Sequence, residues 1–98
     1  MQLQEELVGG EVYQYVSLGN HIVRAIGVCG GRPTFKYTRI EISGALSRLA
    51  SGESMDAIVN GYQGRVSREA LQEAIDLVTR HFLDDLPTLE SPDPVLAS

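Results

Sequence analysis

The sequence has few of the residues that mark several classes of protein. It holds one cysteine, no tryptophan and two phenylalanines in 98 residues. One cysteine cannot form an internal disulfide, and the first ten residues have neither the basic start nor the apolar run of a secretory signal. No apolar run approaches the roughly 18 residues that a membrane-spanning helix needs. We therefore expect a cytoplasmic protein that does not enter a membrane.

Basic residues are also scarce, which limits the partners that the chain can bind. Eight Lys and Arg residues stand against 13 Asp and Glu, for a net charge of −5. A domain that binds nucleic acid is usually basic. The charge is uneven, however, because residues 20–50 hold five basic residues and one acid, whereas residues 51–98 hold three basic residues and nine acids. Any contact with phosphates is therefore expected from the middle of the chain.

Catalytic and metal-binding patterns are not recognisable either. The sequence shows no Ser-His-Asp, Cys-His or paired-carboxylate arrangement, so we expect no enzyme and no cofactor. His21 and His81 lack the spacing of metal ligands. Cys29 could be a redox or metal ligand, but its isolation favours a small buried apolar side chain. Gly30 and Gly31 could bind phosphate through backbone N–H groups, but no P-loop lysine pattern follows, which favours a turn.

The length fits one domain with flexible ends. Residues 1–10 are polar, end in two glycines and are expected to be flexible. Residues 11–26 are rich in β-branched and aromatic residues and predict a β-hairpin, with a tight turn at Gly19-Asn20. Residues 27–42 predict a turn and a short strand. Residues 84–98 hold three prolines and an acidic bias, which predict a flexible tail.

Three helices are predicted over residues 43–83. Apolar residues recur at helical spacing in each, and Ser43, Ser54 and Ser67 precede the three segments as candidate N-caps. Brief connections and a long last helix are typical of a helix-turn-helix unit. The expected fold class is mainly α with an N-terminal β-hairpin, in which residues 11–83 form a single domain with a homeodomain-like or winged-helix-like three-helix unit.

The segment from Val28 to Phe82 resembles a known family, the domain-of-unknown-function 433 family (DUF433), which consists of small prokaryotic proteins, some described as antitoxin-like. Its Cys-Gly-Gly-basic-Pro and Thr-Arg-Ile runs and its helix signals match Cys29, Gly30, Gly31, Arg32, Pro33, Thr38, Arg39, Ile40, Ile42, Leu49, Gly52, Ile58, Tyr62, Ser67 and Ala74. Two residues depart from the family pattern: Tyr37 replaces a glycine, and Glu41 replaces a proline. The resemblance implies a three-helix unit, often dimeric, with a role in DNA binding or toxin neutralisation.

The side chains expected to bind nucleic acid or a partner are basic or amide groups. They are Arg24, Arg32, Lys36, Arg39, Arg48, Arg65, Arg68 and Gln72. Arg39 stands out, since a guanidinium pairs with phosphate or carboxylate oxygens. The alternative is a structural role, in which Arg39 binds backbone carbonyls or an internal acid at the strand–helix junction.

Two functions remain open at this point. The first is a DNA-binding regulator of antitoxin type, a homodimer whose acidic C-terminal tail folds onto a cognate toxin protein. The second is a dimeric protein-interaction module that does not bind nucleic acid. The helix outline and the resemblance favour the first function, and the charge balance favours the second.

Overall fold

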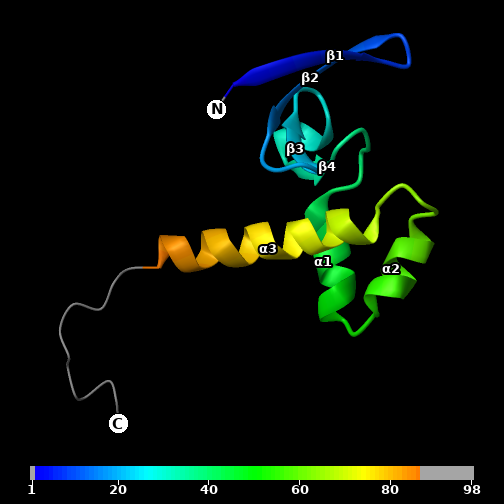
Figure 1. Ribbon diagram of the computed structural model, residues 1–98, viewed down its shortest axis with the longest axis vertical. Helices are drawn as coiled ribbons and strands as arrows, with labels where there is room; N and C mark the ends of the chain where they lie inside the picture. The colour runs from blue at the N-terminus through cyan, green and yellow to red at the C-terminus, as the bar shows by residue number, and fades with distance from the viewer. Residues whose placement is uncertain (1, 87–98) are drawn as a thin grey trace, which may run out of the picture.

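The computed structural model describes residues 2–86, which form four strands followed by three helices (Figure 1). The strands are β1 (Leu3–Val8), β2 (Glu11–Ser17), β3 (Ile22–Ala25) and β4 (Pro33–Phe35), with a short 3-10 turn at Cys29–Gly31. They form one antiparallel sheet in the order β1-β2-β3-β4. The helices are α1 (Ile42–Ala50), α2 (Met55–Gly61) and α3 (Arg68–Asp85).

The fold class expected from the sequence is wrong. The N-terminal half is a four-stranded antiparallel sheet and not a lone hairpin, so the chain has an α+β fold and is not mainly α. The three helices do not stand alone as a homeodomain-like or winged-helix-like unit, because α1 contacts β4 and α3 contacts β3. The short strand expected within residues 27–42 joins the sheet as β4, and the hairpin expected at residues 11–26 is present as β2 and β3.

Strand β1 lies within the residues expected to be flexible. It pairs with β2 over its whole length, from Leu3 opposite Val16 to Val8 opposite Glu11. The two strands are joined by Gly9 and Gly10, whose φ angles are +59° and +83°. Two central residues with positive φ are what a tight two-residue hairpin loop requires. We call β1 and β2 together the ribbon, and Figure 1 shows it at the end of the molecule that lies farthest from α1 and α2.

The turn between β2 and β3 lies at Gly19-Asn20, as predicted, but for a different reason. Neither residue has a positive φ. Instead, a Cβ atom at Gly19 would lie 2.8 Å from the carboxyl carbon of Glu73 on α3. The Glu73 carboxylate accepts backbone hydrogen bonds from Asn20 at 2.9 Å and from His21 at 2.6 Å. A glycine is needed here so that the helix can approach the turn.

Two of the three predicted helix caps are confirmed. The Ser54 hydroxyl accepts a hydrogen bond from the Ala57 amide at 3.1 Å, and the Ser67 hydroxyl accepts one from the Ala70 amide at 3.0 Å. The predicted cap at Ser43 is wrong, because Ser43 lies inside α1 and the helix follows directly from Glu41, which forms a β-bridge with Thr34 in β4. Each side-chain cap stabilises its helix by about 1 kcal/mol.

The buried residues form two separate clusters. The larger joins one sheet face to the helices and contains Ile22, Phe35, Ile42, Ala45, Ile58, Val66, Ala70, Leu71 and Ala74. The smaller contains Tyr15, Val23 and Ala25 on the opposite sheet face. Residues opposite each other in antiparallel strands share a face, so the register assigns Leu3, Val16 and Arg24 to the helix side of the sheet. The helices contact this sheet at β3 and β4, whereas Leu3, Leu7 and Val12 on the ribbon are exposed.

Candidate functional site

Most of the side chains predicted to bind nucleic acid are occupied within the chain. Arg32 forms two hydrogen bonds with the carboxylate of Glu41, at 2.6 and 3.3 Å, and these bonds lower the pKa of Glu41 below its usual value. Arg48 binds the Glu53 carboxylate at 2.8 to 3.2 Å and lies over the ring of Tyr62. The hydrogen bonds with Glu53 raise the pKa of Arg48. Both guanidinium groups therefore bind carboxylates of their own chain.

Three more of the predicted binding side chains also contact groups of their own chain. Arg68 pairs with Asp56, and the amide of Gln72 donates to Asp76 at 3.0 Å. The Nε of Arg24 donates to the Gly31 carbonyl at 2.8 Å. The ion pair with Asp56 reduces the positive charge that Arg68 can offer to phosphates, and the other two contacts engage the polar groups of Gln72 and Arg24 within the chain.

Arg39 and Arg65 are the exceptions among the predicted basic residues. Both are exposed, and neither side chain has a hydrogen bond or ion pair within residues 2–86. Both line one open hollow of about 340 Å³, which is bordered by the turn end of the ribbon and also contains Glu11. The Arg39 backbone carbonyl accepts a hydrogen bond from the thiol of Cys29 at 3.2 Å. The structural alternative predicted that the Arg39 side chain binds a backbone carbonyl or an internal acid. Within residues 2–86, it binds neither.

Cys29 and the two glycines after it form a turn. Cys29 has a φ of +49° and is half-buried, and Gly30 and Gly31 have φ angles of +64° and +79°. Three consecutive positive φ values explain why two glycines are present. Within residues 2–86, no group of three or more His, Cys, Asp or Glu residues could hold a metal ion.

A cluster of tyrosines connects the ribbon to the loop before α1. The Glu6 carboxylate accepts hydrogen bonds from the hydroxyls of Tyr15 and Tyr37, the latter at 2.8 Å, and Lys36 lies 3.7 Å from it. These hydrogen bonds lower the pKa of Glu6, and the bond from Tyr15 has the largest effect. The Lys36 ammonium also lies about 5 Å from the ring centres of Tyr15 and Tyr37. Sequence analysis missed this cluster, since Glu6 was placed in a flexible segment.

Both departures from the family pattern have a structural explanation. Tyr37 has a φ of +67°, a conformation in which glycine is favoured, and its backbone N–H donates to the Tyr13 hydroxyl at 3.0 Å. Its side chain reaches Glu6 in the ribbon. Glu41 is the partner of Arg32. Both replacements therefore add contacts within this chain that the side chain of a glycine or a proline could not make.

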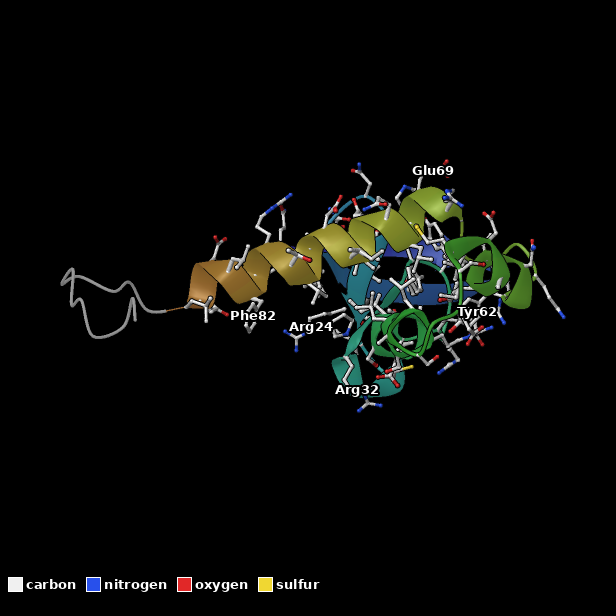
Figure 2. The ribbon with its side chains drawn as sticks, turned by 90° about the horizontal axis from the view of Figure 1, so that it is seen from below. Arg24, Arg32, Tyr62, Glu69 and Phe82 are labelled. Carbon is white, nitrogen blue, oxygen red and sulfur yellow. The ribbon has the colours of Figure 1, made fainter. Side chains whose placement is uncertain are left out.

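Two apolar surfaces remain uncovered within the described part of the chain. The C-terminal half of α3 exposes Val78, Phe82 and Leu83, Leu86 at its C-cap is also exposed, and the helix borders a hollow of about 330 Å³ beside β3 and α1. Figure 2 shows Phe82 pointing to the same side of the molecule as Arg24 and Arg32, while Glu69 points to the opposite side. The apolar spacing of α3 was visible in the sequence, but the exposure of this end of the helix was not.

The second surface lies on the ribbon and directly after β3, and it was not foreseen. Leu7 is 77% exposed, Ile26 63% and Val12 60%. The register of the strands puts Leu7 and Val12 on the helix side of the sheet, and Leu3, Val16 and Ile26 line a hollow of about 280 Å³. We call Leu3, Leu7, Val12, Val16 and Ile26 the aliphatic patch. The sequence signal that could have revealed it is the Gly9-Gly10 pair, which can form a tight hairpin turn, preceded by Leu3 and Leu7 an even number of positions apart.

Among residues 2–86, no helix is long and apolar enough to cross a membrane.

Comparison with known proteins gives a family and no described activity. No curated protein and no solved structure matches the chain. The profile of one family, described as a protein of unknown function (DUF433), matches residues 22–77, which is more than half of the chain. The match begins at β3, ends within α3 and leaves the ribbon outside. The chain belongs to the DUF433 family.

Proposed function

We propose that this protein is a regulator of the antitoxin type that binds a cognate toxin protein through the C-terminal half of α3. One observation carries the proposal: α3 extends beyond the buried core and exposes Val78 and Phe82, four residues apart, with Leu83 beside them. This spacing places Val78 and Phe82 on one face of the helix, which is how an amphipathic helix enters the apolar groove of a partner. The body of the protein anchors the N-terminal half of the same helix.

The charge near this face indicates the chemistry of the partner. Asp84 and Asp85 end α3, and no basic residue lies in its last turn. An acidic, apolar helix end complements a groove with basic residues at its rim. Residues 87–98, where the sequence analysis expected an acidic toxin-binding tail, lie outside the described residues. The proposal therefore rests on α3 alone.

The test uses the product of the adjacent gene as the candidate toxin. We expect its expression to arrest growth and co-expression of the full chain to restore it. Val78→Asp and Phe82→Asp should abolish the rescue, because a buried charge at the centre of an interface weakens binding by roughly 30-fold or more. Arg80→Ala, on the same part of α3, serves as a control that should still rescue. Rescue by both aspartate variants would contradict the proposal.

DNA binding is the second candidate function, and a different observation favours it. Arg39 and Arg65 line one hollow and have no partner within residues 2–86, so both guanidinium groups are available to phosphates. A homodimer would present two such pairs to neighbouring half-sites. The net charge of −5 and the internal ion pairs of Arg32, Arg48 and Arg68 count against it.

A mobility-shift titration on the DNA upstream of the gene tests this candidate. If the arginine pair contacts phosphates, binding should weaken as salt rises, and Arg39→Ala and Arg65→Ala should each make the salt dependence shallower. Arg32→Ala is the control, since Arg32 is occupied by Glu41. Absence of a shift at low salt would exclude this candidate and leave a dimeric protein-interaction module that does not bind nucleic acid.

A further inference from the structure

The aliphatic patch leaves one face of the ribbon exposed to water. The tyrosine cluster covers the opposite face, while Leu3, Leu7 and Val12 on this face are exposed. The main contacts between helices and strands lie at β3 and β4. A partner that buries this face would therefore stabilise the ribbon, because apolar surface is removed from water.

We propose that the aliphatic patch is the interface of a homodimer, in which it packs face to face against the same patch of a second copy. Contiguous exposed apolar side chains mark interaction sites, and a second copy of the chain is present wherever the first one is. Two-fold dimers use the same surface on both subunits, so the patch must be complementary to itself.

Charge makes the patch complementary to itself. Glu5 lies on the same sheet face as the patch, in β1, and Arg24 lies on this face in β3, two strands away. Glu5 is bound only by the amide of Gln14 at 2.9 Å, and Arg24 only by the Gly31 carbonyl at 2.8 Å, within the described residues. A two-fold axis that lies between the two packed faces and runs parallel to β2 brings Glu5 of one copy toward Arg24 of the other, twice per dimer.

The same charges argue against the alternative of pairing along the outer edge of β1. In an antiparallel pair of β1 strands related by a two-fold axis, the residue at the axis lies opposite its own copy. Near the middle of β1, that residue is Glu5 or Glu6. Like charges directly opposite each other destabilise strand pairing, and acids on an edge strand are a common device against it. The sheet face is therefore the interface, and the strand edge is not.

Sedimentation velocity of the full chain over a range of concentrations tests the proposal. We expect the wild type to be a dimer at micromolar concentration, and Leu7→Glu and Val12→Glu to raise the dissociation constant by about tenfold or more. Ala57→Glu, which adds the same charge at an exposed position of α2, should leave the dimer unchanged. A monomeric wild type, or a dimer that tolerates both patch variants, would overturn the proposal.

A charge exchange guards against variants that fail to fold. Glu5→Arg and Arg24→Glu should each weaken the dimer, and the double variant should restore it, while circular dichroism reports the fold of all three. No restoration in a folded double variant would contradict the face-to-face arrangement. Phe82→Asp should remain dimeric, so loss of toxin binding and loss of dimerisation can be told apart.

Discussion

The hydroxyl of Tyr37 donates a 2.8 Å hydrogen bond to the carboxylate of Glu6, 31 residues earlier in the chain. Glu6 lies in the ribbon, outside the family match, and Tyr37 lies inside it. The ring of Tyr37 also contacts that of Tyr13, with ring centres 5.5 Å apart. Tyr37 therefore binds the ribbon, which lies outside the family match, to the matched part of the chain.

Replacing Tyr37 should loosen the ribbon selectively. Tyr37→Gly relieves a positive φ but removes both the hydrogen bond to Glu6 and the ring contact, so hydrogen exchange at the β1 amides should accelerate while the α3 amides keep their protection. Tyr37→Phe keeps the ring and should have a smaller effect on β1. Equal acceleration in β1 and α3 would show that Tyr37 supports the whole fold.

The ribbon should also loosen in acid. Hydrogen bonds from Tyr15 and Tyr37 hold the pKa of Glu6 below its ordinary value of 4.5. A carboxyl whose pKa is lower in the folded state contributes stability above its unfolded pKa and loses this contribution as pH falls through the folded pKa. The difference in melting temperature between wild type and Glu6→Gln should therefore be full near neutral pH and shrink below pH 4.5. A difference that is independent of pH would contradict this assignment.

Glu73 should be worth more to stability than its neighbour Glu69. Its carboxylate accepts hydrogen bonds from the Asn20 and His21 amides, and Glu73→Ala removes both of these bonds to a charged group, at a cost of about 1–3 kcal/mol in the free energy of unfolding. Glu69→Ala, on an exposed position, is the control in urea unfolding.

The same contact predicts coupling between Glu73 and Gly19. A methyl group at residue 19 would lie 2.8 Å from the Glu73 carboxyl carbon, so Gly19→Ala should destabilise the wild type. Its effect should be smaller in the Glu73→Ala background, because the obstructing carboxylate is gone. A double-mutant cycle measures this difference. Additive effects would show that the strain at Gly19 comes from elsewhere.

Two buried threonines should respond to valine in opposite ways. The hydroxyl of Thr34 is buried and has no hydrogen-bond partner among the described residues, so Thr34→Val should raise the free energy of unfolding by about 1 kcal/mol. The Thr38 hydroxyl donates to the Phe35 carbonyl at 2.7 Å and accepts from the Ile40 amide at 3.0 Å. Thr38→Val should therefore lower it by about 1–3 kcal/mol. Thermal unfolding of the two variants, each compared with the wild type, tests both expectations.

The sequence predicted the elements whose signals are local. Ser54 and Ser67 cap α2 and α3, and the hairpin of β2 and β3 follows from its β-branched residues and its turn. β1 was missed because it lacks a regular alternation: Gln4, Glu5 and Glu6 stand together between Leu3 and Leu7, which resembles a polar, flexible start. Only the pairing with β2 makes this segment a strand, and pairing is not a property of the segment by itself.

The candidate site was less predictable, for a related reason. A basic residue is available to a partner only when no acid of its own chain reaches it. Lys36 is approached by Glu6 and Arg68 by Asp56, which are 30 and 12 residues away in the sequence. Nothing in the local sequence distinguishes Arg68 from Arg65, yet one is paired and the other is exposed without a partner. The tertiary contacts of the folded chain therefore determine which of the two arginines is paired.

The two separate clusters of buried residues have a consequence for turnover. Tyr15, Val23 and Ala25 hold the ribbon side of the sheet, while the helices are held by the larger cluster. The ribbon can therefore open without the helices unfolding. A protease acting on the native protein should cut first within the first 20 residues and leave a trimmed domain that still contains α1, α2 and α3. The first cut would then remove the means of self-association before the rest of the chain is degraded.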